Sequence, residues 1–250
     1  IIAAVAFAAR SFASRYGQPR SATGGLQELV VLAMGKLGGS ELNYASDVDV
    51  VLIDKDAGRA RGEALDLSHA LPFRVPATVR AGTFEDIIDS DIVVIAAGPN
   101  QGPGETRLDL AGRNAVVVRD VASEIGARCP DAILIVATNP VDVMARLAHD
   151  CSGLPAARVI GSGTILDTAR LKHLLGRHFG VDPRSIEAQM IGEHGDSAVP
   201  LWSMARAGGI PLEQLAAAVG APFDEEVRAE LAREVRGSAY EIIAGKGATY

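Results

Sequence analysis

Two short segments contain side chains that can move a proton and hold a small acid. The segment GEHGD at 192–196 offers His194, and an imidazole is able to exchange a proton near neutral pH. Upstream, Asp167 is a carboxylate able to orient that histidine, and Arg170 is a guanidinium able to bind a carboxylate through two hydrogen bonds. Arg170 follows Asp167 by three residues, so both can face one side of a helix. A structural histidine and a surface ion pair are the simpler alternatives.

Two further segments extend this set. Arg107 ends a run rich in Gly and Pro, residues 98–107, and Asn139 stands in the segment ATNP at 137–140. The reduction of a 2-oxo acid requires a proton donor, a charge that polarises the carbonyl and a clamp for the carboxylate. The set therefore predicts hydride transfer to a 2-oxo acid. For residues 98–107 the alternative is an ordinary surface loop with a solvated arginine.

The composition favours a soluble globular protein. The chain has 250 residues, of which 48% are hydrophobic and 22% charged. A net charge of −7 argues against a broad basic surface for nucleic acid. The apolar run Ile1–Ala9 is too short to span a bilayer. Cys129 and Cys151 show neither metal-ligand spacing nor a disulfide framework. We expect a cytoplasmic protein without a metal, a nucleic-acid partner or a membrane partner.

Apolar runs alternate with helix-compatible stretches in the first part of the chain. Strand, helix and strand in succession predict a parallel α/β sheet. The expected strands are 29–33, 48–53, 92–97 and 133–137, and the expected helices are 57–68 and 108–127.

A Gly-rich turn after the first of these strands could bind a dinucleotide, although the pattern is incomplete. In such a fold the turn leads to a helix whose N-terminus binds pyrophosphate, and an acid after the second strand binds a ribose. Asp54 is placed for the ribose, with a solvated turn aspartate as the alternative. The turn reads AMGKLG at 33–38, so Ala33 replaces the first glycine. Gly38 precedes Asp54 by 16 residues, fewer than the usual spacing of about 20.

From about residue 151 the pattern changes to helices with short strand-like pieces. We expect helices at 164–175, 211–219 and 223–243, and strands around 185–191 and 198–202. The sequence therefore predicts an N-terminal helix and linker at 1–28, a dinucleotide-binding domain at 29–150 and a catalytic domain at 151–250.

From about residue 50 to residue 250, these segments resemble the L-lactate/malate dehydrogenase family. The resemblance implies an α/β fold: a Rossmann-like parallel sheet with an irregular first βα unit, followed by an α+β substrate domain. It implies NAD as the cofactor and a homo-oligomer, either a dimer or a tetramer. His194 would be the proton donor, with its tautomer fixed by Asp167. Arg107 would close over the substrate carbonyl, and Arg170 would hold the substrate carboxylate.

The same resemblance assigns the remaining site residues. Gln101 stands where the malate enzymes carry an arginine, and a neutral side chain there favours pyruvate, and so lactate, over a dicarboxylate. Asn139 would hydrogen-bond the substrate on its nicotinamide side, and Thr249 would line the pocket. Glu187 stands where relatives activated by a sugar bisphosphate often carry a histidine, so we expect no such activation. The expected cofactor-binding residues are Gly35, Gly38, Asp54, Ala97, Gly98, Ala137, Asn139 and Ser162.

Residues of about 20–53 resemble a different family, the glutamine synthetase adenylyltransferases, through VVLAMGKLGG at 30–39, ELNY at 41–44 and SDVD at 46–49. Asp47 and Asp49 would lie on one face of a strand and could share Mg²⁺, which gives a nucleotidyltransferase as the alternative function. A catalytically impaired dehydrogenase-like scaffold is a third possibility. We interpret the chain as a chimera with its junction near 49–54. We also expect it to be truncated at the C-terminus, because the dehydrogenase family continues past Tyr250.

Overall fold

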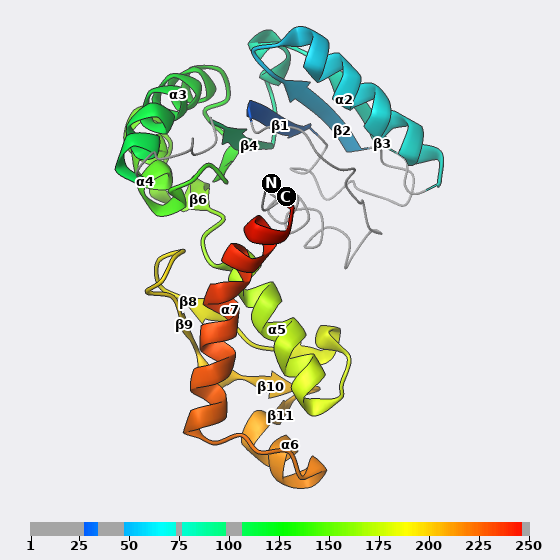
Figure 1. The fold of residues 1–250 in the computed structure, drawn as a ribbon. Helices are drawn as coiled ribbons and strands as arrows, with labels where there is room; N and C mark the ends of the chain where they lie inside the picture. The colour runs from blue at the N-terminus through cyan, green and yellow to red at the C-terminus, as the bar shows by residue number, and fades with distance from the viewer. Residues whose placement is uncertain (1–27, 35–47, 74–76, 99–106, 247–250) are drawn as a thin grey trace. The chain divides into compact units, whose positions relative to one another are not determined.

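The computed structural model describes residues 28–34, 48–73, 77–98 and 107–246. The chain divides into two compact units, with the boundary between Ser162 and Gly163 (Figure 1). The sequence predicts a boundary near residue 150, and the structural boundary falls later because the strand at 159–161 still pairs with the sheet of the first unit. Of the predicted N-terminal helix and linker, residues 1–27 lie outside the described residues.

The first unit is built on a sheet whose strand order is β3-β2-β1-β4-β5-β6. The pairs β2/β3, β4/β5 and β5/β6 are parallel, as the sequence predicts. This is the strand order of a doubly wound dinucleotide-binding sheet. The strands are β1 (Glu28–Met34), β2 (Val48–Ile53), β3 (Ala77–Ala81), β4 (Ile92–Ala97), β5 (Ile133–Val136) and β6 (Val159–Gly161).

β1 is the irregular strand of this sheet. It runs antiparallel to both neighbours, and its residue Val30 lies opposite Ile53 of β2 and Ile95 of β4. Its last residue, Met34, lies opposite Asp49, at the edge of the sheet where β2 begins. In a regular dinucleotide-binding sheet the first strand is parallel to its neighbours and ends where they end. The parallel arrangement therefore holds for the other strands, and the irregularity expected of the first βα unit is found in the direction of β1.

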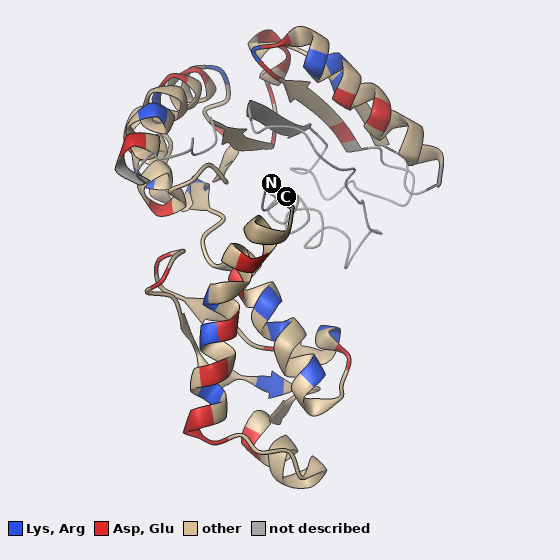
Figure 2. Ribbon diagram, in the orientation of Figure 1, with Lys and Arg blue, Asp and Glu red and all other residues tan. Residues whose placement is uncertain are grey.

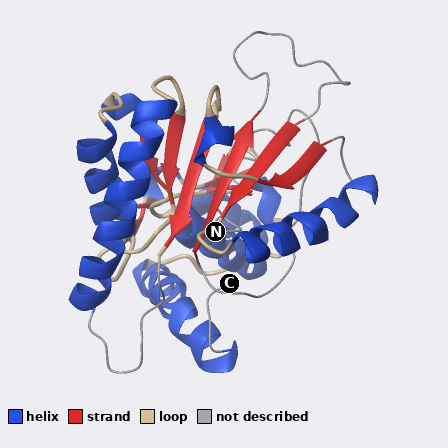
Figure 3. Cartoon of the chain, turned by 90° about the horizontal axis from the view of Figure 1, so that it is seen from above, coloured by secondary structure: helices blue, strands red, loops and turns tan. Residues whose placement is uncertain are grey.

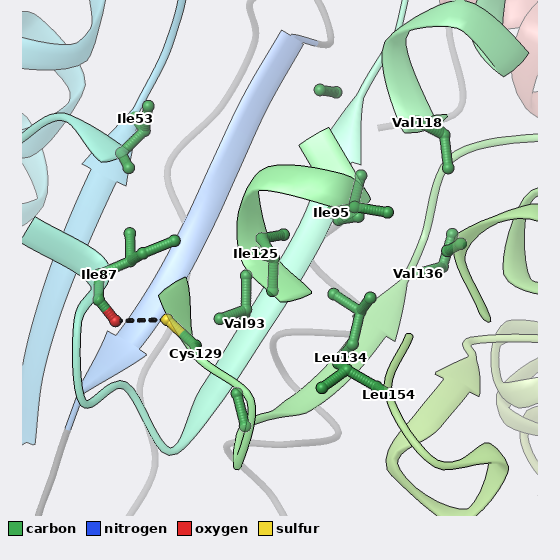
Figure 4. Packing of buried hydrophobic residues seen from close by; sticks show 14 of the residues in the cluster. Ile53, Ile87, Val93, Ile95, Val118, Ile125, Cys129, Leu134, Val136 and Leu154 are labelled. Atoms are coloured by element: carbon green, nitrogen blue, oxygen red, sulfur yellow. Dashed lines mark hydrogen bonds between the residues drawn. The ribbon is translucent and has the colours of Figure 1, made fainter. Parts of the chain in front are cut away.

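Three helices lie beside this sheet and bury its apolar residues. α2 (Ala57–Ala70) packs along β2 and β3, whereas α3 (Arg107–Arg128) and α4 (Val141–Ser152) pack against each other and along β4 and β5 (Figure 3). Every residue of β4 is buried, as expected for a central strand of a parallel sheet. Figure 4 shows Val93 and Ile95 of β4 among the core residues.

The core of the first unit also contains a cysteine. Cys129 donates a hydrogen bond from Sγ to the carbonyl oxygen of Ile87 at 2.7 Å (Figure 4). Burial raises the pKa of the Cys129 thiol. This cysteine is therefore a packed, protonated group in the core rather than a nucleophile.

The second unit has a core of its own between two long helices and several short strands. α5 (Ile165–Phe179), α6 (Leu212–Val219) and α7 (Glu225–Lys246) supply most of its apolar side chains. The strands are β7 (Ile186–Glu187), β8 (Met190–Ile191), β9 (Val199–Pro200), β10 (Arg206–Ala207) and β11 (Ile210–Pro211).

Most of the expected elements are confirmed to within a few residues at their ends, whereas β3, α4, β6, β10 and β11 have no counterpart in the prediction. Acidic and basic residues are interspersed along α7, whereas the charged residues of α5 are mostly basic (Figure 2). In the part of the chain that the structure describes, no helix is long and apolar enough to cross a membrane.

Candidate active site

α5 brings a carboxylate into the core of the second unit. Leu171, Leu174, Leu175 and Phe179 recur at helical spacing and are buried, which fixes one face of α5 against the core. Asp167 precedes Leu171 by four residues and so lies on the same face, where it is only 6% exposed. A buried carboxylate requires partners that compensate its charge.

Asp167 has two such partners, one on each oxygen. Its Oδ2 lies 2.6 Å from Nδ1 of His194, and its Oδ1 lies 3.0 Å from Nη1 of Arg170. The side chains of Asp167, Arg170 and His194 are 8%, 13% and 27% exposed. The structure thus brings together the three residues that the sequence singled out within this unit, and His194 is the most accessible of them.

This arrangement determines which ring nitrogen of His194 can react. An ionised carboxylate only accepts hydrogen bonds, so Nδ1 carries a proton and donates it to Asp167. Nε2 is then the atom able to exchange a proton with another molecule, and the carboxylate stabilises the imidazolium form. Arg170 uses one of its five N–H donors on Asp167, which fixes the plane of the guanidinium.

The segment around His194 is a tight turn with its own hydrogen bonds. Gly192 has φ of +94°, a conformation that side chains rarely adopt. The N–H of Ala198 donates to the carbonyl oxygen of Gly195 at 3.2 Å, and the hydroxyl of Ser197 donates to Glu193 at 3.0 Å. The turn is also tied to α7, because Arg236 donates to the carbonyl oxygen of Ala198 at 3.3 Å.

In the first unit, the expected cofactor-binding residues that are described lie along one edge of the sheet. β5 pairs with β4 and β6 in register, with Val136 opposite Ile95 and Gly161. The residues that follow these strands therefore emerge together at their carboxyl ends, which is where doubly wound sheets bind ligands. They are Ala97, Gly98, Ala137, Asn139 and Ser162, with Asp54 at the end of β2.

One observation at this edge fits a bound dinucleotide, and a second shows how closely the strand ends are packed. Asp54 accepts a hydrogen bond from the N–H of Asp56 on Oδ1, whereas its Oδ2 is buried and has no hydrogen-bond partner among the described residues. A ribose hydroxyl is the group that such an acid binds in these sheets. Gly98 leaves no room for a side chain, because a Cβ there would lie 2.6 Å from Oδ1 of Asn114. The glycine at position 98 is therefore required by the packing of the Asn114 and Thr138 side chains.

The sequence reasoning missed Asn114, which is 2% exposed and lies on α3. Its Nδ2 donates to the main-chain oxygen of Asn139 at 2.6 Å. Beside it, the hydroxyl of Thr138 donates to the main-chain oxygen of Ala97 at 2.7 Å. These contacts hold the ends of β4 and β5 together. Asn114 stands four residues before buried Val118, on the apolar face of α3. A polar residue on such a face indicates a buried group with a specific hydrogen-bond partner, and the sequence alone contains this signal.

Several predicted site residues cannot be placed. Gly35, Gly38, Gln101 and Thr249 lie outside the described residues. Arg107 is the first residue of α3, and only its backbone is described. Glu187 is exposed in β7.

A doubly wound sheet, followed along the chain by a unit with an imidazole–carboxylate–guanidinium cluster, is typical of dinucleotide-dependent dehydrogenases. Residues 26–161 match the NAD-binding domain of lactate/malate dehydrogenases, and residues 164–250 match the α/β C-terminal domain of the same enzymes. This chain therefore belongs to the lactate/malate dehydrogenase family.

Individual relatives agree with this assignment. The chain is 51% identical over 201 residues to an L-lactate dehydrogenase of Gloeobacter violaceus, a match that covers 80% of this chain and 61% of that protein. It is 50% identical over 202 residues to an L-lactate dehydrogenase of Thermus aquaticus, covering 81% of this chain and 65% of the relative. Among solved structures, MGS-M5, a lactate dehydrogenase from a deep-sea metagenome library, superposes with a TM-score of 0.75 at 42% identity, covering 81% of this chain and 64% of that one. The chain thus spans less than two thirds of the length of these relatives.

Proposed function

We propose that this chain interconverts L-lactate and pyruvate, with NAD as the hydride carrier. The observation that carries the proposal is the cluster in which Asp167 contacts both His194 and Arg170. Its support from outside the structure is the match to relatives that are named L-lactate dehydrogenase.

His194 is the proton donor in this proposal. The carbonyl carbon of pyruvate receives a hydride, and the negative charge that develops on its oxygen is neutralised by the proton on Nε2 of His194. Asp167 holds the ring through Nδ1 and stabilises the imidazolium before the proton is transferred. In lactate oxidation the same nitrogen accepts the hydroxyl proton.

Four further residues orient, polarise or enclose the substrate. The guanidinium of Arg170 binds the carboxylate of pyruvate with two parallel hydrogen bonds, which aligns the substrate as well as attracting it. The charge of Arg107 polarises the substrate carbonyl. Asn139 hydrogen-bonds the substrate on its nicotinamide side, and Thr249 lines the pocket.

The described residues fit a nicotinamide dinucleotide at the carboxyl ends of the strands. Asp54 offers for a ribose a buried oxygen that has no hydrogen-bond partner in the described part of the chain. NAD supplies or accepts the hydride when it is bound. We propose that Ala97, Ala137, Asn139 and Ser162 line the same site, together with Gly35 and Gly38.

Pyruvate is the proposed substrate rather than a dicarboxylate because Gln101 offers no charge to a second carboxylate. NADH oxidation measured separately with pyruvate and with oxaloacetate tests this choice. We expect a larger kcat/KM for pyruvate, and we expect Gln101→Arg to shift the preference toward oxaloacetate. A wild-type preference for oxaloacetate would contradict the proposal.

The adenylyltransferase-like alternative stays a prediction about residues 20–53. Asp49 is exposed and accepts a hydrogen bond from the hydroxyl of Thr78, whereas Asp47 lies outside the described residues. Nucleotidyl transfer needs a third carboxylate, and no three potential metal ligands gather within the described part of the chain. Mg²⁺-dependent nucleotidyl transfer that disappears in Asp47→Ala would support this function and the chimeric origin. A chain that binds NADH and never reduces pyruvate would instead be the impaired scaffold.

We further propose a cytoplasmic homo-oligomer, as the family resemblance implies, with a dinucleotide-binding domain followed by a substrate domain. Sedimentation or light scattering of the purified chain tests the oligomeric state.

For Glu187 we propose that its negative charge excludes a sugar bisphosphate, so that adding one leaves the rate of pyruvate reduction unchanged.

A further inference from the structure

The contact between Asp167 and His194 depends on two segments that are separated along the chain. Asp167 belongs to the first turn of α5, and His194 follows β8 by three residues. The distance between the side chains of Asp167 and His194 is not set by their spacing along the chain. Some structural element must therefore hold β8 against the first turn of α5.

Two threonines of α5 provide this connection through a single residue of β8. The hydroxyl of Thr164 donates to the main-chain oxygen of Met190 at 2.6 Å. The main-chain N–H of Met190 donates to the hydroxyl of Thr168 at 2.9 Å. Thr164 lies at the N-cap of α5 and makes no capping hydrogen bond with its side chain, so its hydroxyl serves β8 instead.

The pairing of β8 with β9 shows why these side chains are needed. Met190 lies opposite Pro200, which has no N–H to donate to it. Met190 is buried at 2% exposure, and buried main-chain groups require hydrogen-bond partners. The threonine hydroxyls satisfy both its N–H and its carbonyl. They also flank Asp167, because Thr164 precedes it by three residues and Thr168 follows it directly.

We propose that Thr164 and Thr168 are positioning residues that hold His194 against Asp167 through the backbone of Met190. Neither threonine belongs to the residues proposed to bind the substrate or the cofactor. The effect of the two threonines on catalysis rests on the proposed function. Their effect on the contact between Asp167 and His194 does not depend on that function.

The test uses Thr164→Val and Thr168→Val, since valine keeps the β-branched shape of threonine and removes the hydroxyl. Proton NMR of the chain without NAD or pyruvate reports the ring N–H of His194, which a hydrogen bond to Asp167 shifts downfield and protects from exchange. Its resonance is assigned by its absence in His194→Asn. We expect the signal to be lost in both valine variants and retained in Thr168→Ser, which restores the hydroxyl.

A second readout is the reduction of pyruvate. We expect kcat to fall by about 10- to 100-fold in the valine variants while the affinity for NADH is unchanged, because a small displacement of a reacting group has effects of that size. Ala216→Gly, in α6, is the control that weakens the same unit without touching either threonine. It should keep both the signal and kcat.

The outcomes separate the two proposals. An inactive wild-type chain that shows the His194 signal, with loss of that signal in the valine variants, would support the positioning role and refute the dehydrogenase activity. A signal that persists in both valine variants would overturn the positioning role, and so would its absence from the wild-type chain. If Thr168→Val fails to fold, the comparison of Thr164→Val with the wild-type chain decides the matter.

Discussion

At the scale of residues, Asp167 contacts both His194 and Arg170 with one carboxylate, so its replacement should affect both. In Asp167→Asn the amide oxygen can accept a hydrogen bond, yet the amide N–H₂ can also donate to Nδ1 and favour the wrong tautomer of His194. We expect kcat for pyruvate to fall by about 10²- to 10⁴-fold, the usual contribution of a positioned acid–base group. Steady-state NADH oxidation measures this effect.

The matched control is Asp182→Asn, which removes an exposed carboxylate paired with Arg184. Arg184 lowers the pKa of Asp182 to about 2, and the pair lies outside the candidate active site. This variant should keep the wild-type kcat. Equal rates in the two variants would show that Asp167 has no special role.

Arg170 is expected to act through the shape of its side chain as well as its charge. Arg170→Lys keeps the charge and loses the planar fork that binds a carboxylate at two points. A hydrogen bond to a charged group contributes about 1.5–3 kcal/mol, so KM for pyruvate should rise by about 10- to 100-fold. Arg177→Lys, at an exposed position of the same helix, is the control. An unchanged KM in Arg170→Lys would contradict the proposed clamp.

The two cysteines should differ in reactivity. Burial raises the pKa of Cys129, so at pH 8 a smaller fraction of it is thiolate than for an ordinary thiol. Cys151 is only half-buried. We expect iodoacetamide at pH 8 to modify Cys151 first, with the sites identified by mass spectrometry of the peptides. Faster labelling of Cys129 in the folded chain would contradict its placement in the core.

At the scale of elements, two glycines of α3 have opposite expected effects on stability. A Cβ at Gly126 would lie 1.8 Å from the main-chain oxygen of Ser152 at the end of α4, whereas a Cβ at Gly112 meets nothing within 4 Å among the residues that the structure describes. We expect Gly126→Ala to cost about 1–3 kcal/mol by forcing α3 and α4 apart. Gly112→Ala should stabilise the helix by up to about 1 kcal/mol.

Urea unfolding of the two variants, followed by circular dichroism, gives the comparison. Both substitutions replace glycine by alanine in the same helix. A difference in helix propensity therefore cannot explain changes of opposite sign in the free energy of unfolding. Equal shifts of the urea midpoint would mean that α3 and α4 do not pack as described.

The elements that the sequence predicted are those with a long apolar pattern. β4 could be recognised because six apolar residues stand in a row. α3 could be recognised because its helical spacing of apolar residues extends over a helix of 22 residues, too long a pattern to arise by chance. β6 has three residues and is too short for any period to show. α4 did carry a signal, since Val141, Met144 and Ala148 recur at helical spacing, and it was overlooked.

Other features depend on tertiary structure and leave no local pattern. An apolar run such as β1 is equally compatible with either strand direction, so its antiparallel pairing could not be foreseen. The spacing of Asp167 and Arg170 follows from the helical repeat and was predictable. The contact of Asp167 with His194 joins segments 27 residues apart and was expected only from the family resemblance.

At the scale of the whole molecule, the first strand of the sheet bears on cofactor affinity. β1 ends at the edge where β2 begins, and Ala33 replaces the first glycine of the turn. A pyrophosphate turn needs that glycine and needs its strand to end beside the other carboxyl ends. We expect the Kd for NADH to be at least about tenfold higher than that of the Thermus aquaticus relative, equivalent to about 1.4 kcal/mol.

Fluorescence titration of both proteins with NADH under the same conditions measures this difference. Asp54→Ala should weaken binding further, because it removes the carboxylate whose Oδ2 lacks a partner within the described structure. An affinity equal to that of the relative would contradict the expected defect.

The most direct test of the central claim, that His194 supplies the proton for hydride transfer to pyruvate, is a single-turnover experiment. Enzyme saturated with NADH is mixed with pyruvate, and the loss of NADH absorbance is followed for the wild-type chain and for His194→Asn. We predict a rate lower by about 10²-fold or more in the variant, with unchanged NADH binding. Equal rates of NADH oxidation in the two proteins would contradict the account.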